Sequence, residues 1–175
     1  MSRPRSSGLI VPVEAACELV TPWLDRLPAG IRDLPPHVTA LWPFLPADGL
    51  DAALEARLNA LLSGLPAFDF ALTRVGGFAD VVFLAPEPAE RFVELTRALW
   101  DQWPECPPFG GAYDEVVPHL TVALDPPPGR RREIETVVAP LLPLAARAAE
   151  VLLVEQDEGG TLVVRRRFAL GDPAA

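Results

Sequence analysis

Two histidines occur in this 175-residue chain, and both lie in the same short motif. His37 and His119 are each preceded by a proline and followed two residues later by a threonine, Thr39 or Thr121. The unperturbed pKa of histidine lies near neutrality, so one imidazole can act as a base while a second acts as an acid at cellular pH. The repeated His-x-Thr motif therefore indicates acid–base chemistry.

Each motif lies in a stretch that we expect to be a β-strand, at 37–42 and 119–124. Side chains alternate along a strand, so the histidine and the threonine of one motif share a face and lie about 6.6 Å apart. We expect this polar face to line a cleft and the opposite face to pack under helices. The residues predicted on the packed face are Val38, Ala40, Trp42, Leu120, Val122 and Leu124.

Two histidines and two threonines suit reactions at a phosphodiester. Such a reaction needs a base for the attacking oxygen and an acid for the leaving oxygen, and hydroxyl groups can donate to the non-bridging oxygens without a metal. One alternative is that both histidines are structural. Another is a metal site that adds Asp80, Asp114 or Glu115, since imidazole and carboxylate suit zinc or iron, but no ligand spacing in the sequence supports it.

Hydrophobic periodicity and turn residues predict the remaining elements. We expect a loop at 28–36, with Asp48 as the cap of the helix that follows the first motif. The expected strands are 8–13, 68–75, 81–85, 148–155 and 161–170. The expected helices are 14–27, 89–103, 130–144 and the helix capped by Asp48, whose apolar positions run from 50 to 62. The order of elements restarts after 76–77, which predicts one domain over 1–175 with an internal repeat of roughly 7–75 and 81–170.

Composition restricts the possible partners. Half of the residues are apolar, all 15 basic residues are arginine, and 24 acidic residues give a net charge of −9. This balance disfavours binding of long duplex nucleic acid, which depends on cationic contacts to phosphates. No stretch is apolar enough for a membrane span, and two cysteines without metal spacing indicate a reducing compartment. We therefore expect a cytoplasmic protein without a membrane partner, and a monomer.

The motifs and their surroundings resemble the two-histidine phosphoesterase superfamily, which includes bacterial 2'-5' RNA ligase-like proteins and 2',3'-cyclic nucleotide phosphodiesterases. The resemblance extends to a closing hairpin and covers nearly the whole chain. The stretches that carry it are PPHVTALWPF at 35–44, VGGFADVVFLAP at 75–86 and FGGAYDEVVPHLTVAL at 109–124.

The resemblance implies a bilobal α+β fold, in which each lobe is an antiparallel sheet with outer helices and a central cleft holds both motifs. It implies that His37 and His119 are the acid–base pair and that Thr39 and Thr121 hold the phosphate. It also implies opening of 2',3'-cyclic phosphates, or of related 2'-5' or cyclic diester bonds, without a metal or other cofactor. The sequence does not decide which histidine is the base.

Four further residues are candidates for contacts with a small nucleotide or an RNA end. Phe44 and Tyr113 flank the motifs and could stack on a base, with packing as the alternative. Arg165 and Arg167 would share one strand face and could contact phosphate, with a solvated sheet edge as the alternative. A nucleotide-binding module with little catalysis is the second functional hypothesis. A 2'-5' RNA ligase is the third, and the acidic, lysine-free composition disfavours it.

Overall fold

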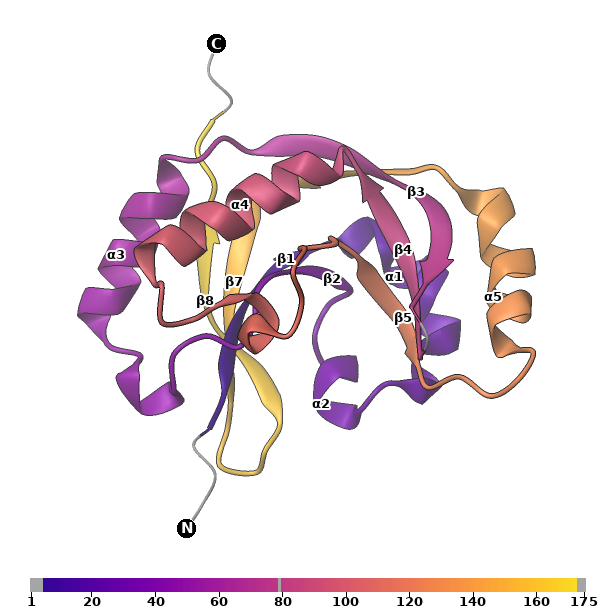
Figure 1. The fold of residues 1–175 in the computed structure, drawn as a ribbon, viewed down its shortest axis with the longest axis horizontal. Coiled ribbons are helices and arrows are strands. Elements are labelled where there is room, and N and C mark those ends of the chain that lie inside the picture. The colour runs from indigo at the N-terminus through magenta and orange to yellow at the C-terminus, as the bar shows by residue number, and fades with distance from the viewer. Residues whose placement is uncertain (1–4, 79, 173–175) are drawn as a thin grey trace.

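A computed structural model describes residues 5–78 and 80–172, and within them eight strands form one antiparallel sheet (Figure 1). The strand order is β6-β3-β4-β5-β2-β1-β7-β8. The strands are β1 Ser7–Pro12, β2 His37–Leu41, β3 Phe68–Gly77, β4 Val81–Glu87, β5 Leu120–Leu124, β6 Leu144–Ala148, β7 Glu150–Gln156 and β8 Leu162–Ala169. The predicted α+β fold, with one half of the sheet around each motif, is confirmed.

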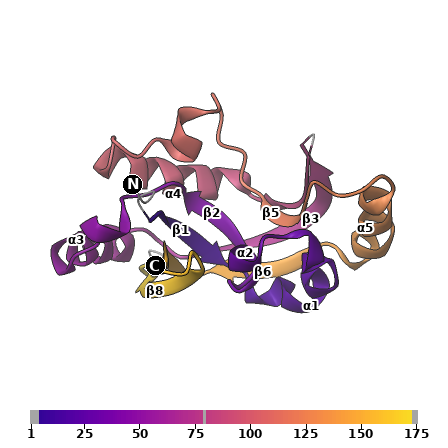
Figure 2. The ribbon, with the colours of Figure 1, turned by 90° about the horizontal axis from the view of Figure 1, so that it is seen from below.

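Five α-helices and five 3-10 helices connect the described strands. In both views α3 and α5 lie at opposite ends of the molecule (Figures 1 and 2). The α-helices are α1 Cys17–Val20, α2 Ala29–Arg32, α3 Ala52–Ser63, α4 Ala89–Gln102 and α5 Arg130–Val138. The 3-10 helices are η1 Glu14–Ala16, η2 Thr21–Arg26, η3 Ala47–Gly49, η4 Pro108–Gly111 and η5 Ala139–Leu141. None of the helices in the described ranges is both long and apolar enough to cross a membrane.

The two halves of the sheet meet where β2 pairs with β5. Val38 opposite Leu120 is the one registered pair of these strands within the described residues. Neither half is a continuous stretch of chain, because β3 follows the first motif but pairs with β4 and β6 beside the second. The two strands that carry the motifs are therefore neighbours at the centre of the sheet.

The apolar residues of the sheet divide into two clusters because side chains alternate along each strand. On β1, Leu9 and Val11 belong to the main core, whereas Ile10 belongs to a smaller cluster on the other face. Helices α3 and α4 contribute to the main core through Leu54, Leu58, Leu62, Phe92, Leu95 and Leu99. The smaller cluster consists of Ile10, Leu34, Leu152 and Val154, with Trp42 and Leu162 packed against it.

Proline accounts for two differences between the predicted and observed helices. The expected helix at 14–27 is divided into η1, α1 and η2, with Pro22 in the first turn of η2, because proline lacks the N–H that a continuous helix needs. The expected helix at 130–144 ends at Val138, before Pro140, and the chain then forms β6. The prediction also missed α2 within the expected loop, and the cap of α3 is Asp51 rather than Asp48.

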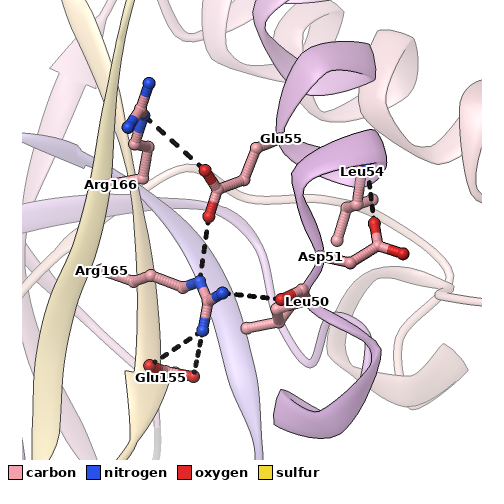
Figure 3. Close-up of polar contacts among 7 residues, drawn as sticks. All are labelled: Leu50, Asp51, Leu54, Glu55, Glu155, Arg165 and Arg166. Carbon is pink, nitrogen blue, oxygen red and sulfur yellow. Dashed lines mark hydrogen bonds and ion pairs between the residues drawn. The ribbon is translucent and has the colours of Figure 1, made fainter.

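An ion-pair cluster ties β8 to α3 (Figure 3). The register of β7 with β8 shifts so that Leu153 opposes Arg166 and Val154 opposes Val164, which leaves Arg165 as an extra, bulged residue. Arg165 and Arg166 then both contact Glu55 of α3, and Arg165 also binds Glu155 and the carbonyl of Leu50. The expectation that Arg165 and Arg167 share a face is wrong, because the bulge interrupts the alternation.

We expect Arg165→Ala to lower the free energy of unfolding by about 1–3 kcal/mol, because it removes charge-assisted bonds from two carboxylates and one carbonyl. Arg167→Ala is the matched control. Arg167 has one ion pair, with Glu150, and is 54% exposed against 30% for Arg165, so its loss should be below about 1 kcal/mol. Urea denaturation of both variants measures the difference, and equal losses would contradict the structural role of the cluster.

Candidate active site

Both motifs open into one cavity of about 210 Å³ between the two halves of the sheet. Extending the antiparallel pairing of Val38 with Leu120 by one residue places His37 opposite Thr121 and Thr39 opposite His119. Each histidine therefore faces the threonine of the other motif. The cavity is lined by Ile10, Val20, Leu24, Leu27, Ile31, Leu34, Pro35, Pro36, His37, Thr39, Trp42, Phe109, His119, Thr121, Leu124, Val154 and Leu162.

A β-bulge follows the threonine in each motif strand. Thr39 pairs with Ile10 and Leu41 with Leu9, so Ala40 is the extra residue of β2. In β5, Thr121 pairs with Phe83 and Ala123 with Val82, so Val122 is the extra residue. Such a bulge interrupts the strict alternation of side chains.

The bulges overturn one expectation about each strand. Trp42 and Leu124 were both predicted on the packed face, but both line the cavity instead. Leu41 and Ala123, directly before them, join the main core. Beyond its bulge, each motif therefore presents a third side chain to the cavity in addition to the histidine and the threonine.

The two imidazoles make the same backbone hydrogen bond. Nδ1 of His37 lies 2.8 Å from the carbonyl oxygen of Pro35, and Nδ1 of His119 lies 2.7 Å from that of Val117. A carbonyl oxygen only accepts, so Nδ1–H is the donor in both rings. In the neutral ring Nε2 then holds the lone pair, which makes it the nitrogen available to a ligand.

Burial lowers the pKa of both histidines below the ordinary value of 6.5. For His37 the backbone bond to Pro35 opposes this effect, and the positive charge of His119 lowers the pKa further. For His119 the backbone bond to Val117 partly offsets burial. Because each positive charge disfavours the other, the pair favours states with one proton or none over the doubly protonated state.

Three phenylalanines surround His119. Its ring centroid lies 5.3 Å from that of Phe78, 5.4 Å from that of Phe83 and 6.3 Å from that of Phe109, which is stacked on it with an interplanar angle of 21°. Phe109 has a positive φ of 52°, and its N–H donates to the carbonyl of Trp42. The sequence contains Phe109 in a Pro-Pro-Phe-Gly-Gly turn, but no local pattern marks it as part of the cavity.

Arg131 of α5 anchors the β3–β4 turn that carries Phe78. Its guanidinium donates to the carbonyls of Phe78, at 2.6 Å, and Val81, at 3.1 Å. Gly77 leaves room for it, since a Cβ there would lie 2.1 Å from Nη2 of Arg131. This arginine thus helps to hold Phe78 against His119.

Several predicted ligand contacts are not found at the cavity. Phe44 is buried in the main core with its ring 5.4 Å from that of Trp103, so the prediction that it stacks on a base is wrong. Tyr113 is 71% exposed and contacts the edge of Phe109 outside the cavity lining. Neither Arg165 nor Arg167 lines the cavity, because both bind carboxylates elsewhere.

The alternative metal site is not formed. None of Asp80, Asp114 and Glu115 lines the cavity. Within residues 5–78 and 80–172, no three His, Cys, Asp or Glu side chains are grouped closely enough to hold a metal ion.

Comparison with protein families and solved structures gives consistent results. The model of the 2'-5' RNA ligase superfamily matches residues 12–160. No curated protein sequence matches the chain. Solved structures with the same fold include E. coli LigT complexed with NADP+, at 21% identity, with 98% of this chain and 100% of that chain covered and a TM-score of 0.62. TT0787 of Thermus thermophilus is also 21% identical, with 97% and 100% covered and a TM-score of 0.66.

We expect His119→Gln to raise the pKa of His37, because the substitution removes a neighbouring positive charge. Titration of the imidazole resonances by NMR measures this change, and it should also show both wild-type histidines titrating below 6.5. Tyr113→Phe, which removes no charge, is the control and should leave both values unchanged. A pKa of His37 that is at or above 6.5, or unaffected by the loss of His119, would contradict the coupling.

Proposed function

Because this chain belongs to the 2'-5' RNA ligase superfamily, we propose that it is a metal-independent phosphodiesterase that opens 2',3'-cyclic phosphates of nucleotides or RNA ends. One observation carries the proposal. The two His-x-Thr motifs lie side by side on neighbouring strands and line one cavity, and both imidazoles have the same tautomer with Nε2 available. An acid and a base on opposite sides of a phosphate are what in-line displacement requires.

In this mechanism His37 is the base and His119 is the acid. His37 is the more deeply buried of the two imidazoles, and burial disfavours the charged form, so the singly protonated pair holds its proton on His119. A water oxygen attacks phosphorus while Nε2 of His37 takes a proton from that water. The bond from phosphorus to one ribose oxygen breaks, and His119 donates a proton to this leaving oxygen. The products are a phosphomonoester and a free hydroxyl group.

Thr39 and Thr121 stabilise the charge on the phosphate. Both hydroxyls line the cavity, and within the described part of the chain neither has a protein partner for a hydrogen bond. Each can therefore donate to a non-bridging oxygen, where negative charge is concentrated in the transition state.

The choice of nucleotides as substrates is supported by relatives of the same fold. Solved structures of E. coli LigT include complexes with NADP+, 3'-AMP and ATP. Ligation of long RNA is less well supported, because the net charge is −9 and no arginine is found in the part of the lining that the structure describes. If the protein binds nucleotides but does not open cyclic phosphates, the second hypothesis, a nucleotide-binding module with little catalysis, is favoured.

Incubation with 2',3'-cyclic nucleotides and cyclic-phosphate-ended oligonucleotides in EDTA tests the proposal. We expect turnover by the wild type, and a loss of about 10²–10⁴-fold in kcat for His37→Gln and for His119→Gln. Absence of turnover on every substrate, or unchanged turnover in either variant, would reject the proposed reaction.

We expect Thr39→Val and Thr121→Val each to lower kcat by about 10–10³-fold, since each removes one donor to the transition state. Thr136→Val on α5, whose hydroxyl donates to the carbonyl of Arg132, is the matched control and should retain full activity. Steady-state kinetics of the three variants make the comparison. Equal losses in all three would show that the effect is not specific to the cavity.

The pH dependence of kcat/KM should be bell-shaped with its maximum on the acid side of 6.5. The base must be neutral, so the rate falls below its pKa, and the acid must be protonated, so the rate falls above its pKa. Both pKa values are lowered in the free protein, which places both limbs at lower pH. Bound phosphate raises both values, so the maximum of kcat should lie at higher pH than that of kcat/KM. A maximum of kcat/KM above about pH 7.5 would contradict this assignment.

A further inference from the structure

Outside the two motifs, the described residues that line the cavity contribute apolar side chains and the indole of Trp42. Among the side chains that the structure describes, no Arg, Asp or Glu lines it, and no Ser, Asn or Gln does. The polar groups that the described side chains offer to a ligand are therefore those of the two motifs and the indole N–H of Trp42. The apolar lining residues are Ile10, Val20, Leu24, Leu27, Ile31, Leu34, Pro35, Pro36, Phe109, Leu124, Val154 and Leu162.

The smaller apolar cluster contributes directly to this lining. Ile10 and Val154, from adjacent strands β1 and β7, are buried in that cluster and also line the cavity. Trp42 and Leu162 pack against the same cluster and line the cavity as well. This part of the lining is therefore continuous with a packed core rather than with a solvated surface.

Gly8 of β1 leaves room for the indole of Trp42 to pack directly against the strand. A Cβ at Gly8 would lie 1.9 Å from Cε3 of Trp42, so any other residue at position 8 would displace the indole. The carbonyl of Trp42 accepts the N–H of Phe109 at 2.6 Å. Two aromatic side chains that line the cavity are thus fixed relative to each other.

The segment from η2 to α2 supplies the remaining wall. Leu24 of η2 and Ile31 of α2 are half-buried, and Leu27 between them is buried. Helix α2 packs against β8, which brings this wall next to Leu162. The apolar wall is therefore built from both ends of the chain.

We infer that the cavity binds, next to the phosphodiester, one neutral flat or apolar group that is recognised by shape and burial rather than by hydrogen bonds or charge. The inference rests on the proposed function, and it names the substrate class as a diester of a single nucleoside or of an aromatic group of similar size. A charged extension on this side would lose its hydration without gaining a partner, which is costly. The base is held by its faces, so its polar edges contribute little to specificity.

Three 2',3'-cyclic phosphates test this subsite: those of adenosine, of 1-phenylribose, which lacks polar base edges, and of 1,4-anhydroribitol, which lacks a base. We expect the phenyl compound to have a kcat/KM within about threefold of that of adenosine. Burial of one ring predicts a kcat/KM about 10–100-fold lower for anhydroribitol, mainly through KM. A phenyl compound as poor as anhydroribitol, or anhydroribitol as good as adenosine, would overturn the inference.

Leu24→Asn and Leu19→Asn form a matched pair. Both leucines are half-buried and pack against the main core, but only Leu24 lines the cavity. Leu24→Asn should raise KM about tenfold for the two ring-bearing substrates and leave that of anhydroribitol unchanged, whereas Leu19→Asn should not discriminate among the three. Ile31→Asn provides a second cavity variant, and circular dichroism confirms folding. Equal effects of Leu24→Asn on all three substrates would overturn the inference.

Calorimetry with the 3'-monophosphates of adenosine, 1-phenylribose and 1,4-anhydroribitol separates this inference from the proposed function. If no cyclic phosphate is opened, but the first two ligands bind similarly and about 10–100-fold more tightly than the third, the subsite stands and the proposed reaction fails. If the cyclic phosphates are opened but the three monophosphates bind equally, the reaction stands and the subsite is rejected.

Discussion

The pairing of β2 with β5 is the contact on which the site depends. Each half of the sheet has its own hairpins and core contacts, yet the two motifs meet only because Val38 lies opposite Leu120. A shift of this register by one residue would turn one motif away from the other, since neighbouring side chains lie on opposite faces. The main core behind both strands opposes such a shift, because the shift would move Val38 or Leu120 out of the packed interior.

Much of this arrangement could be predicted from the sequence because it follows from alternation and from paired motifs. His37 and Thr39 face one side, Val38 and Ala40 face the other, and both motif strands lie together. Prediction failed where one extra residue changed the alternation, as at Trp42, Leu124 and Arg165. A bulge depends on how two strands pair, so periodicity within one strand does not reveal it.

Aromatic contacts were harder to predict than polar ones for a similar reason. Phe44 and Phe109 both lie near a motif in the chain, but Phe44 packs on Trp103 and Phe109 stacks on His119. Which of the two reaches the cavity depends on the left-handed turn at Phe109 and its hydrogen bond to Trp42. The two arginines expected to contact phosphate instead bind carboxylates, as Arg165 does with Glu55, and neither Arg165 nor Arg167 lines the cavity.

The surroundings of the two histidines differ, so the two sides of the site are not equivalent. The motifs themselves are nearly symmetric, and a symmetric pair would accept a phosphodiester equally well in either orientation. Within the described residues, the aromatic rings in contact with a histidine are those of Phe78, Phe83 and Phe109, and all three contact His119. His37 instead lies beside Pro35 at the start of β2. In the proposed reaction, this difference in packing around equivalent imidazoles would distinguish the two ester oxygens of one phosphate, and the duplicated motif would then perform two different tasks.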